Sequence, residues 1–409
     1  MRICIVCHYF WPEISAPSAR LKEMAEAWVA AGHEVTAVTN FPNHPSGEIQ
    51  AGYRGKHFLE ERVDGIRILR CRTYATPNTG ILKKTLGHLV FAWNVTRQAA
   101  RHLAGTDVIL VSSPTLFSAV GALRLGRRLG CPYVLEVRDL WPAIFVELGV
   151  LKNPLLIRAL ERLELFLYHR SRSVVAVTQA FADDIASRGI DKDKIAVIRN
   201  GVDLARFEPG EKSAAVAREF GVEGRFVVLY IGAHGISHGL GAVLEAARRL
   251  EQEPDVHFLF VGEGAEKEAL VQRAREMNLA NVSFHPAQPR DRVADLYRLA
   301  DVCLVPLRNI PLFRTFIPSK MFEIMGSGRP IVAAVEGEAA EILAESRAAR
   351  IAPPEDAAAI AAAILELKKD PALRDELARN GREFAMKHYD RRELARRYLE
   401  ILVQAAGNP

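Results

Sequence analysis

Apolar, strand-like runs alternate with helix-like segments along nearly the whole chain of 409 residues, and this alternation constrains the fold most. The first half predicts a helix at residues 18–31 and strands at 2–7, 33–39, 108–112, 133–137, 173–177 and 195–198. Strands that alternate with helices form parallel sheets wrapped by those helices. The pattern therefore predicts an α/β fold.

The alternation starts again after a charged stretch, 206–212, that contains Pro and Gly. A chain of this length exceeds the size at which a single core keeps growing, so we predict two domains with a boundary near residue 205. The tail from residue 357 is rich in Ala, Leu and Glu and is predicted to be helical, with a last helix at about 391–404. Further strands are predicted at 226–231, 257–261, 282–284, 302–305 and 331–334.

Composition excludes several classes of protein. The net charge is only +5, from 54 Lys and Arg against 49 Asp and Glu, which does not indicate nucleic-acid binding. Cys4 and Cys7 lie in the first strand, and no second pair completes a zinc site, so we interpret them as core residues in a reducing compartment. The N-terminus shows no signal-peptide pattern, and the longest apolar run, 108–123, is too interrupted to span a bilayer.

The segment 317–330, IPSKMFEIMGSGRP, is the strongest candidate site. Pro318 and Ser319 are typical of a helix start, and Lys320 and Glu323 share one helical face. A helix start beside a cation favours the binding of phosphate, and a carboxylate one turn further along is suited to accept the hydroxyls of a ribose. The segment thus predicts a seat for a nucleotide diphosphate. The alternative is an ordinary capped helix with both charges solvated.

Two glycine-containing loops follow predicted strands. The first holds Gly232, His234, Gly235 and His238, and its glycines permit close approach to a phosphate, although a flexible turn is the alternative. The second, Gly262-Glu263-Gly264, is a weaker signal. No G-x-G-x-x-G follows a strand, so a dinucleotide fingerprint is absent.

Charged residues end the strand at 133–137 in the block 136–142, EVRDLWP. Such charges are costly in a buried strand unless they are functional or paired, so either a site at Asp139 or a structural pair of Arg138 with Glu136 or Asp139 is expected. Asp191 and Asp193 form a D-x-D of the kind that some metal-dependent sugar transferases use, but we interpret it as a polar turn.

Residues 65–106 carry seven Lys or Arg and no Asp or Glu. Leu82, Leu86, Leu89, Val90 and Trp93 recur there at helical spacing. A basic, partly apolar helix of this kind predicts an element that lies on an anionic membrane surface. Alternatively, the apolar stripe packs on the core of the first domain.

These pieces together resemble the family 4 glycosyltransferases of the GT-B fold. The resemblance rests on their order along the chain: 9–13 with Arg20, 136–142, 200–203, 230–232, 262–264, 300–306, 318–330 and 352–356. It implies two Rossmann-like domains with a cleft between them. Residues 1–205 would form the acceptor-side domain, 206–387 the nucleotide-sugar domain, and a helix at 388–409 would cross back to the first domain.

The block 138–142 and the basic segment are most similar to bacterial members that build O-antigen or capsule polysaccharides. The resemblance implies a retaining, metal-independent and cofactor-free transfer from a UDP-sugar to a polyprenyl-diphosphate-linked acceptor. The sugar would be an N-acetylated amino sugar of the fucosamine type. We expect a cytoplasmic enzyme, peripheral on the inner face of the membrane.

The same resemblance assigns roles to residues. Asp139 would orient or activate the acceptor, Lys320 and Arg20 would stabilise the departing diphosphate, and Glu323 would bind the ribose. The loop at 13–18 would close over the donor together with Arg20. The other expected donor-binding residues are Ser319, Gly232, His234, Gly235, His238, Gly262, Glu263 and Arg314.

This chain departs from the family pattern in three places. Thr315 stands where the first glutamate of the Glu-x7-Glu motif is expected, and the post-strand phosphate loop has His234 and His238 in place of Arg and Lys. Residues 15–18 replace a more Gly-rich loop. Two alternatives therefore stay open, a nucleotide-sugar epimerase of the same architecture and a non-catalytic nucleotide-binding component of a polysaccharide machine.

Overall fold

The computed structural model describes residues 1–13, 15–43, 46–75, 81–113 and 116–407. The chain divides into two compact units, one formed by residues 1–199 with residues from 392 onward, and the other by residues 200–391. The predicted boundary near residue 205 lies a few residues too late. Val202 exchanges backbone hydrogen bonds with the segment at Tyr389 and Arg391, and these bonds tie residues 200–205 to the second unit.

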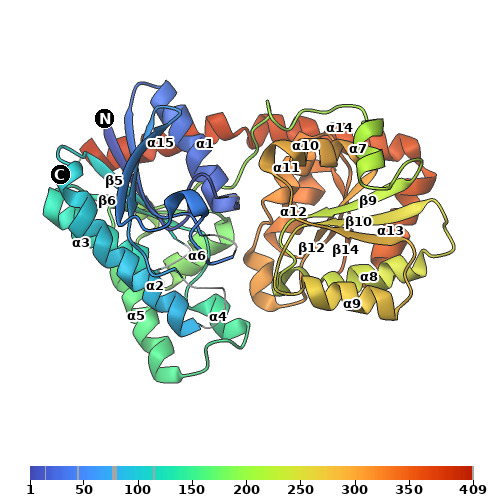
Figure 1. The fold of residues 1–409 in the computed structure, drawn as a ribbon, viewed down its shortest axis with the longest axis horizontal. Coiled ribbons are helices and arrows are strands. Elements are labelled where there is room, and N and C mark those ends of the chain that lie inside the picture. The colour runs from blue at the N-terminus through green and yellow to red at the C-terminus, as the bar shows by residue number, and fades with distance from the viewer. Residues whose placement is uncertain (14, 44–45, 76–80, 114–115, 408–409) are drawn as a thin grey trace. The chain divides into compact units, whose positions relative to one another are not determined.

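The first unit is built on an eight-stranded sheet in the order β3-β4-β2-β1-β5-β6-β7-β8 (Figure 1). All neighbouring strands are parallel except β3 and β4, which form an antiparallel hairpin that the sequence patterns had not indicated. The strands are β1 (Arg2–Cys7), β2 (Glu34–Asn40), β3 (Phe58–Val63), β4 (Ile66–Cys71), β5 (Val108–Ser112), β6 (Tyr133–Val137), β7 (Ser173–Ala176) and β8 (Ile195–Val197).

Helices cover both faces of this sheet. Helices α1 and α15 pack on the face that presents Val108 and Leu110, and α3 contacts the opposite face at Ile109. The final helix, α15, thus belongs to the core of the first unit, where Trp28 donates its indole N–H to the carbonyl of Ala395 at 2.8 Å. The helices are α1 (Ala16–Ala30), α2 (Ile81–Asn94), α3 (Leu116–Leu129), α4 (Ala143–Glu147), α5 (Pro154–Arg170), α6 (Gln179–Ser187) and α15 (Arg391–Gly407).

The second unit has a six-stranded, fully parallel sheet in the order β11-β10-β9-β12-β13-β14. Its order reverses direction between β9 and β12, and ligands of open α/β sheets bind at such switch points, outside the carboxyl ends of the strands. The strands are β9 (Phe226–Ile231), β10 (Val256–Val261), β11 (Val282–His285), β12 (Val302–Pro306), β13 (Ile331–Ala334) and β14 (Ala349–Ala352).

Helices α8, α9 and α13 bury their apolar faces in one large cluster against this sheet, as Figure 1 shows for α8 and α9. A short 3-10 helix, η6 (Pro311–Thr315), lies between β12 and α11. The helices are α7 (Ala214–Glu219), α8 (Leu240–Arg249), α9 (Lys267–Glu276), α10 (Arg290–Leu299), α11 (Lys320–Gly326), α12 (Glu338–Ser346), α13 (Ala357–Lys369) and α14 (Pro371–His388).

Candidate active site

Helix α11 begins at Lys320, as the sequence predicted, and Gly328 ends the segment with a φ of +61° before β13. The predicted cap is wrong. Ser319 has helical backbone angles, φ −59° and ψ −27°, and its side chain makes no capping hydrogen bond. Its hydroxyl is therefore not committed to the end of the helix, and its expected role in donor binding stays a prediction.

Lys320 of the second unit has a buried amine. Its Nζ lies 3.8 Å from the centre of the Tyr230 ring, is shielded from solvent, and has no hydrogen-bond partner among the described residues. Burial lowers the pKa of Lys320 to about 7, although the nearby Glu323 opposes the shift. A desolvated amine without a partner is unfavourable, so this position favours the arrival of an anion.

Gly232 makes room for this amine. It follows β9 with a φ of +142°, and a Cβ built at this position would lie 2.9 Å from Lys320 Nζ. Tyr230 holds its ring beneath the amine by donating its hydroxyl to the carbonyl of Ala233 at 2.6 Å. The structure thus brings together two elements that the sequence marked as separate phosphate candidates, the loop after β9 and the start of α11.

The two histidines of this loop are neutral at physiological pH. Burial is the main cause that lowers the pKa of His234 to about 4 and that of His238 to about 3, and Lys320 contributes to both shifts. His234 is fully buried, with its ring near those of Tyr230, Phe260 and Phe284. Neither histidine replaces the missing fixed cations of the loop.

The loop after β10 serves packing. A Cβ at Gly262 would lie 1.8 Å from the carbonyl oxygen of Gly232, and one at Gly264 would lie 2.3 Å from that of His234. Both glycines therefore let the loops after β9 and β10 touch. Glu263 pairs with Lys267 at 2.7 Å, so its carboxylate is directed to α9 and not to Lys320. Gly235 differs, because open space surrounds its Cβ position.

Glu323 faces a different neighbour from Lys320. Its carboxylate accepts from Arg290 Nη1 and from the Tyr297 hydroxyl, each at 3.2 Å. Both partners come from α10, which sequence analysis did not connect to the site. The side chain is 15% exposed, so it lies at the edge of the unit.

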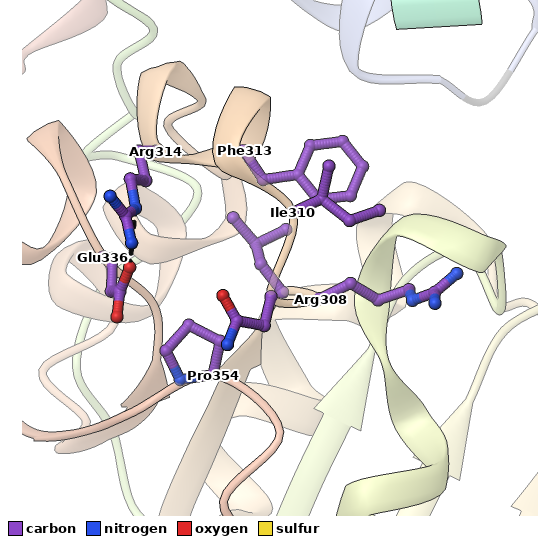
Figure 2. A pocket seen from close by; sticks show the side chains of 8 residues that line it. Arg308, Ile310, Phe313, Arg314, Glu336 and Pro354 are labelled. Atoms are coloured by element: carbon purple, nitrogen blue, oxygen red, sulfur yellow. Dashed lines mark hydrogen bonds and ion pairs between the residues drawn. The ribbon is translucent and has the colours of Figure 1, made fainter. Parts of the chain in front are cut away.

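A pocket opens at the carboxyl ends of β12, β13 and β14 (Figure 2). Arg314 of η6 pairs with Glu336, two residues after the end of β13, at 2.7 Å on one side of this pocket. Thr315 turns its hydroxyl back to the carbonyl of Leu312 at 2.7 Å, so it does not substitute for the expected glutamate. Glu336 is a carboxylate that sequence analysis missed, although its place after a strand was a usable signal. The pocket is lined by Leu307, Arg308, Asn309, Ile310, Phe313, Arg314, Glu336 and Pro354.

In the first unit, Arg20 is not exposed to a ligand. It is 1% exposed, pairs with Glu136 at 3.2 Å, and donates to the carbonyls of Ile198 and Arg199 at 2.8 and 2.7 Å. The expectation that Arg20 closes over the donor does not fit this burial. Glu13 likewise accepts backbone N–H bonds from Phe10 and Asn43, and residue 14 of that loop lies outside the described residues.

Glu136 is fully buried, and it also accepts from Ser112 at 2.9 Å and lies 3.5 Å from Arg138. Burial alone would raise the pKa of Glu136, but Arg20 and Arg138 outweigh it and lower the pKa. The structural pair of Arg138 with Glu136 is therefore present, as one of the alternatives predicted.

Asp139 differs from Glu136 in the direction of its pKa shift. Burial raises the pKa of Asp139 to about 6, with Arg138 opposing. It lines a mostly apolar pocket together with Ser113, Leu116, Ala119, Leu135, Val137, Trp141 and Tyr168. A carboxyl group with a pKa close to neutrality, next to a cavity, has the properties that a general base requires.

Comparison with known proteins decides the family. Residues 15–201 match the family described as "Glycosyl transferase 4-like domain", and residues 214–384 match "Glycosyl transferases group 1". The chain belongs to the family 4 glycosyltransferases. Among curated relatives, this glycosyltransferase is 26% identical over 347 residues to the putative colanic acid biosynthesis glycosyl transferase WcaI of Escherichia coli, covering 82% of this chain and 84% of WcaI.

Solved structures show the same GT-B fold. Sucrose-phosphate synthase from Thermosynechococcus elongatus superimposes with a TM-score of 0.79 at 19% identity, covering 98% of both chains. Anabaena HepE, solved in complex with UDP and glucose, gives a TM-score of 0.75 at 18% identity and covers 98% of this chain and 99% of its own. This glycosyltransferase therefore has the two Rossmann-like units of GT-B enzymes.

The basic segment of the glycosyltransferase exposes its apolar stripe. Leu86, Leu89 and Trp93 of α2 are 48%, 46% and 54% exposed, whereas Phe91 and Val95 are buried. The alternative in which the stripe packs on the core is thus wrong for these three residues. The side chains of Leu82 and Lys84, and residues 76–80, lie outside the described residues.

This exposed face continues onto two further helices. Helix α3 packs between α2 and α5, and Figure 1 shows the three helices along one side of the first unit. Arg124 of α3 lies 5.1 Å from the ring centre of Trp93, and neither α2 nor α3 contains Asp or Glu. Helix α5 adds exposed Leu155, Leu156 and Phe166. The exposed cations on α2, α3, α5 and the residues that follow α2 include Lys83, Arg97, Arg101, Arg124, Arg127, Arg128, Arg158, Arg162 and Arg170.

Three other observations complete the comparison with the sequence. Asp191 accepts the N–H of Asp193 and caps a short turn, which confirms the turn interpretation of the D-x-D. Cys4 and Cys7 are buried in β1, as predicted. Within the described part of the chain, no helix has both the length and the apolar character needed to cross a membrane.

Proposed function

We propose that this glycosyltransferase moves a sugar from a UDP-sugar to a polyprenyl-diphosphate-linked acceptor during synthesis of a bacterial surface polysaccharide. The transfer retains the anomeric configuration and needs neither a metal ion nor a cofactor. The single observation that carries the proposal is Lys320, whose buried amine lies without a hydrogen-bond partner above Tyr230 and Gly232. A diphosphate is the ligand that such an amine lacks.

Two comparisons support the substrate classes. HepE, which shares the fold, was solved with UDP and glucose, and WcaI is named for colanic acid biosynthesis. The resemblance of the block 138–142 supports an N-acetylated amino sugar as the group transferred. Glu323 is the residue proposed to accept the ribose hydroxyls, because its carboxylate is partly exposed on the same helix as Lys320.

The reaction is then mostly electrostatic. The bond between the sugar C1 and the diphosphate oxygen breaks through an oxocarbenium-like state, and Lys320 neutralises the charge left on the diphosphate. The acceptor hydroxyl oxygen forms the new bond to C1. Asp139 orients this hydroxyl and takes its proton, for which a pKa of about 6 is suitable.

The test is a transfer assay with purified enzyme. A polyprenyl diphosphate that carries N-acetylglucosamine is incubated with UDP-N-acetylglucosamine, UDP-glucose or UDP-N-acetylfucosamine, and lipid-linked product is quantified with and without EDTA. Transfer of one sugar, unchanged by EDTA and with the donor's anomeric configuration by NMR, is expected. Conversion of the donor sugar without any lipid product would identify an epimerase, and binding without turnover would identify a non-catalytic component.

We also propose that the face formed by α2, α3 and α5 docks on anionic lipid. Exposed apolar side chains lie there among many cations, and Glu161 is the exposed acid on these helices. Each cation near such a surface contributes about 1 kcal/mol.

Flotation with vesicles of phosphatidylcholine and phosphatidylglycerol tests this surface. The triple variant Arg97→Gln, Arg124→Gln, Arg158→Gln should bind at least tenfold more weakly than the parent chain. The matched control neutralises three exposed arginines of the second unit, Arg248, Arg249 and Arg275. Equal losses in both triples, or none in the first, would reject this face as the docking surface.

A further inference from the structure

The carboxylate of Glu323 is held on both oxygens. Oε1 accepts from Arg290 Nη1 and Oε2 accepts from the Tyr297 hydroxyl, each at 3.2 Å. Arg290 and Tyr297 are seven residues apart on α10, which is two helical turns, so they project from the same face of that helix. Two side chains on one face of α10 therefore both hydrogen-bond to a single carboxylate on α11.

The two donors pack against the buried ring of Phe207. Tyr297 is 1% exposed, and its ring centre lies 5.9 Å from that of Phe207, which is fully buried. The guanidinium of Arg290 lies 5.7 Å from the centre of the same Phe207 ring. Burial, together with Glu323, raises the pKa of Tyr297 far above its usual value. The phenol therefore stays protonated and donates a hydrogen bond to Glu323. Tyr297 is thus buried, and the Arg290 side chain, which is 24% exposed, packs on the same ring.

The carboxylate keeps capacity for a ligand. An ionised carboxylate has about four acceptor positions, two on each oxygen, and one on each is used by α10. One position on each oxygen remains, and the Glu323 side chain is still 15% exposed. Two free positions on two fixed oxygens match a vicinal diol, which donates two hydrogen bonds side by side.

We propose that Arg290 and Tyr297 are positioning residues that fix the Glu323 carboxylate to receive the 2′- and 3′-hydroxyls of the donor ribose. The inference rests on the proposed function, because it deepens the nucleotide site assumed there. Without the two donors the carboxylate would rotate about its side-chain bonds, and ordering it would cost part of the binding free energy. Both residues act through Glu323 and touch no reacting atom.

The experiment compares two nucleotides by calorimetry, UDP and 2′,3′-dideoxyuridine diphosphate, which lacks both hydroxyls. The parent chain should prefer UDP by at least tenfold, since hydrogen bonds to a charged acceptor are lost in the analogue. Tyr297→Phe should weaken UDP about fivefold and leave the analogue unchanged. Arg290→Gln should act in the same direction, and Arg290→Lys should restore part of the preference.

The matched control is Tyr133→Phe in the first unit. It removes an equally buried hydroxyl, which donates to the carbonyl of Leu167 at 2.6 Å, and should change neither affinity. A purely structural role for Tyr297 would weaken both nucleotides equally and overturn the inference. If Tyr297→Phe folds poorly, the Arg290 variants decide the question by the same ratio.

The two proposals fail differently. If the parent chain binds UDP and its dideoxy analogue equally, the nucleotide site survives but Glu323 is not the ribose ligand, and the inference is overturned. If the parent chain binds neither UDP nor the analogue, the proposed donor fails and the inference falls with it. Glu323→Gln should abolish the preference for UDP while the analogue still binds.

Discussion

Two buried cations of this enzyme differ in whether they have hydrogen-bond partners. Arg20 in the first unit is 1% exposed and satisfied, with a carboxylate at 3.2 Å and two backbone carbonyls within 2.8 Å. Lys320 in the second unit has a buried Nζ that faces an aromatic ring and no hydrogen-bond acceptor among the described residues. Both lie near carboxyl ends of strands, and the family resemblance assigned both to the departing diphosphate.

The difference separates structure from function. A buried charge that is fully paired contributes to folding, and its removal leaves the partner charge buried and unpaired. A buried charge without an acceptor costs free energy in the unliganded protein, and that cost is recovered only when an anion binds. Arg20 therefore belongs to the architecture of the first unit, and Lys320 to the proposed chemistry of the second.

The largest expected effect is on folding. Arg20→Met should lower the free energy of unfolding of the first unit by about 3–5 kcal/mol, because Glu136 would be left as a buried carboxylate with Arg138, at 3.5 Å, as its remaining cation. All four tryptophans lie in the first unit, at positions 11, 28, 93 and 141, so their fluorescence in urea reports this unit selectively.

The control for this prediction removes both charges. Arg20→Met combined with Glu136→Leu should recover most of the stability, since an ion pair replaced by apolar residues is often neutral. A double variant as unstable as the single one would show that Arg20 acts mainly through the carbonyls of Ile198 and Arg199.

The second prediction concerns Lys320→Met. We expect affinity for UDP to fall about 100-fold, because a charge-assisted contact to the diphosphate is lost in a desolvated site. The melting temperature without ligand should stay the same or rise, because a costly buried amine is removed. Lys368→Met is the control, as it breaks pairs with Glu253 and Asp255 on the same unit and should leave UDP binding unchanged. Normal UDP affinity in Lys320→Met would refute the phosphate seat.

The third prediction is a pH dependence. In the free enzyme the pKa of Lys320 is about 7, and a bound diphosphate raises it. Below pH 7 the amine is already charged and affinity is flat. Above pH 7 binding must take up a proton, so affinity falls about fivefold between pH 7 and pH 8 and about tenfold for each further pH unit. The histidines nearby, with pKa values of about 4 and 3, stay neutral throughout.

Calorimetry with UDP-N-acetylglucosamine checks this dependence, because its diphosphate is esterified at both ends and does not titrate in this range. Lys320→Arg should bind with a flat profile, since guanidinium stays protonated. A parent profile that is flat from pH 6 to pH 8 would mean that another cation holds the diphosphate.

The strands with continuous apolar runs were predictable, because both faces of a parallel sheet are buried. The hairpin β3–β4 was missed, although Asp64 and Gly65 form its turn, both with positive φ. Strand β3 lies at the edge and contains three consecutive charged residues, Glu60, Glu61 and Arg62, so no continuous apolar run marks it. Edge strands carry weaker sequence signals for this reason.

The candidate site was predictable where its residues are neighbours in sequence. Lys320 and Glu323 share one short helix, and Gly232 follows a strong strand. The residues that contact these side chains are distant in sequence. Tyr297 lies 26 residues before Glu323, and Tyr230, which contacts Lys320, lies on a different element of the second unit. These contacts depend on how helices and strands pack, which no local pattern encodes. The burial of Arg20 was hidden for the same reason.

The smallest expected effect is that of Gly235→Ala, which contrasts with Gly262→Ala in the neighbouring loop. Gly262→Ala should lower the stability of the second unit measurably, because its Cβ would lie 1.8 Å from the carbonyl of Gly232 and its φ is +154°. Gly235→Ala should change stability by less than about 0.5 kcal/mol, since its Cβ position is open and its φ of −111° suits any residue. If Gly235→Ala nevertheless weakens UDP binding, its backbone approaches the diphosphate as predicted. If it changes neither property, Gly235 is not part of the phosphate seat.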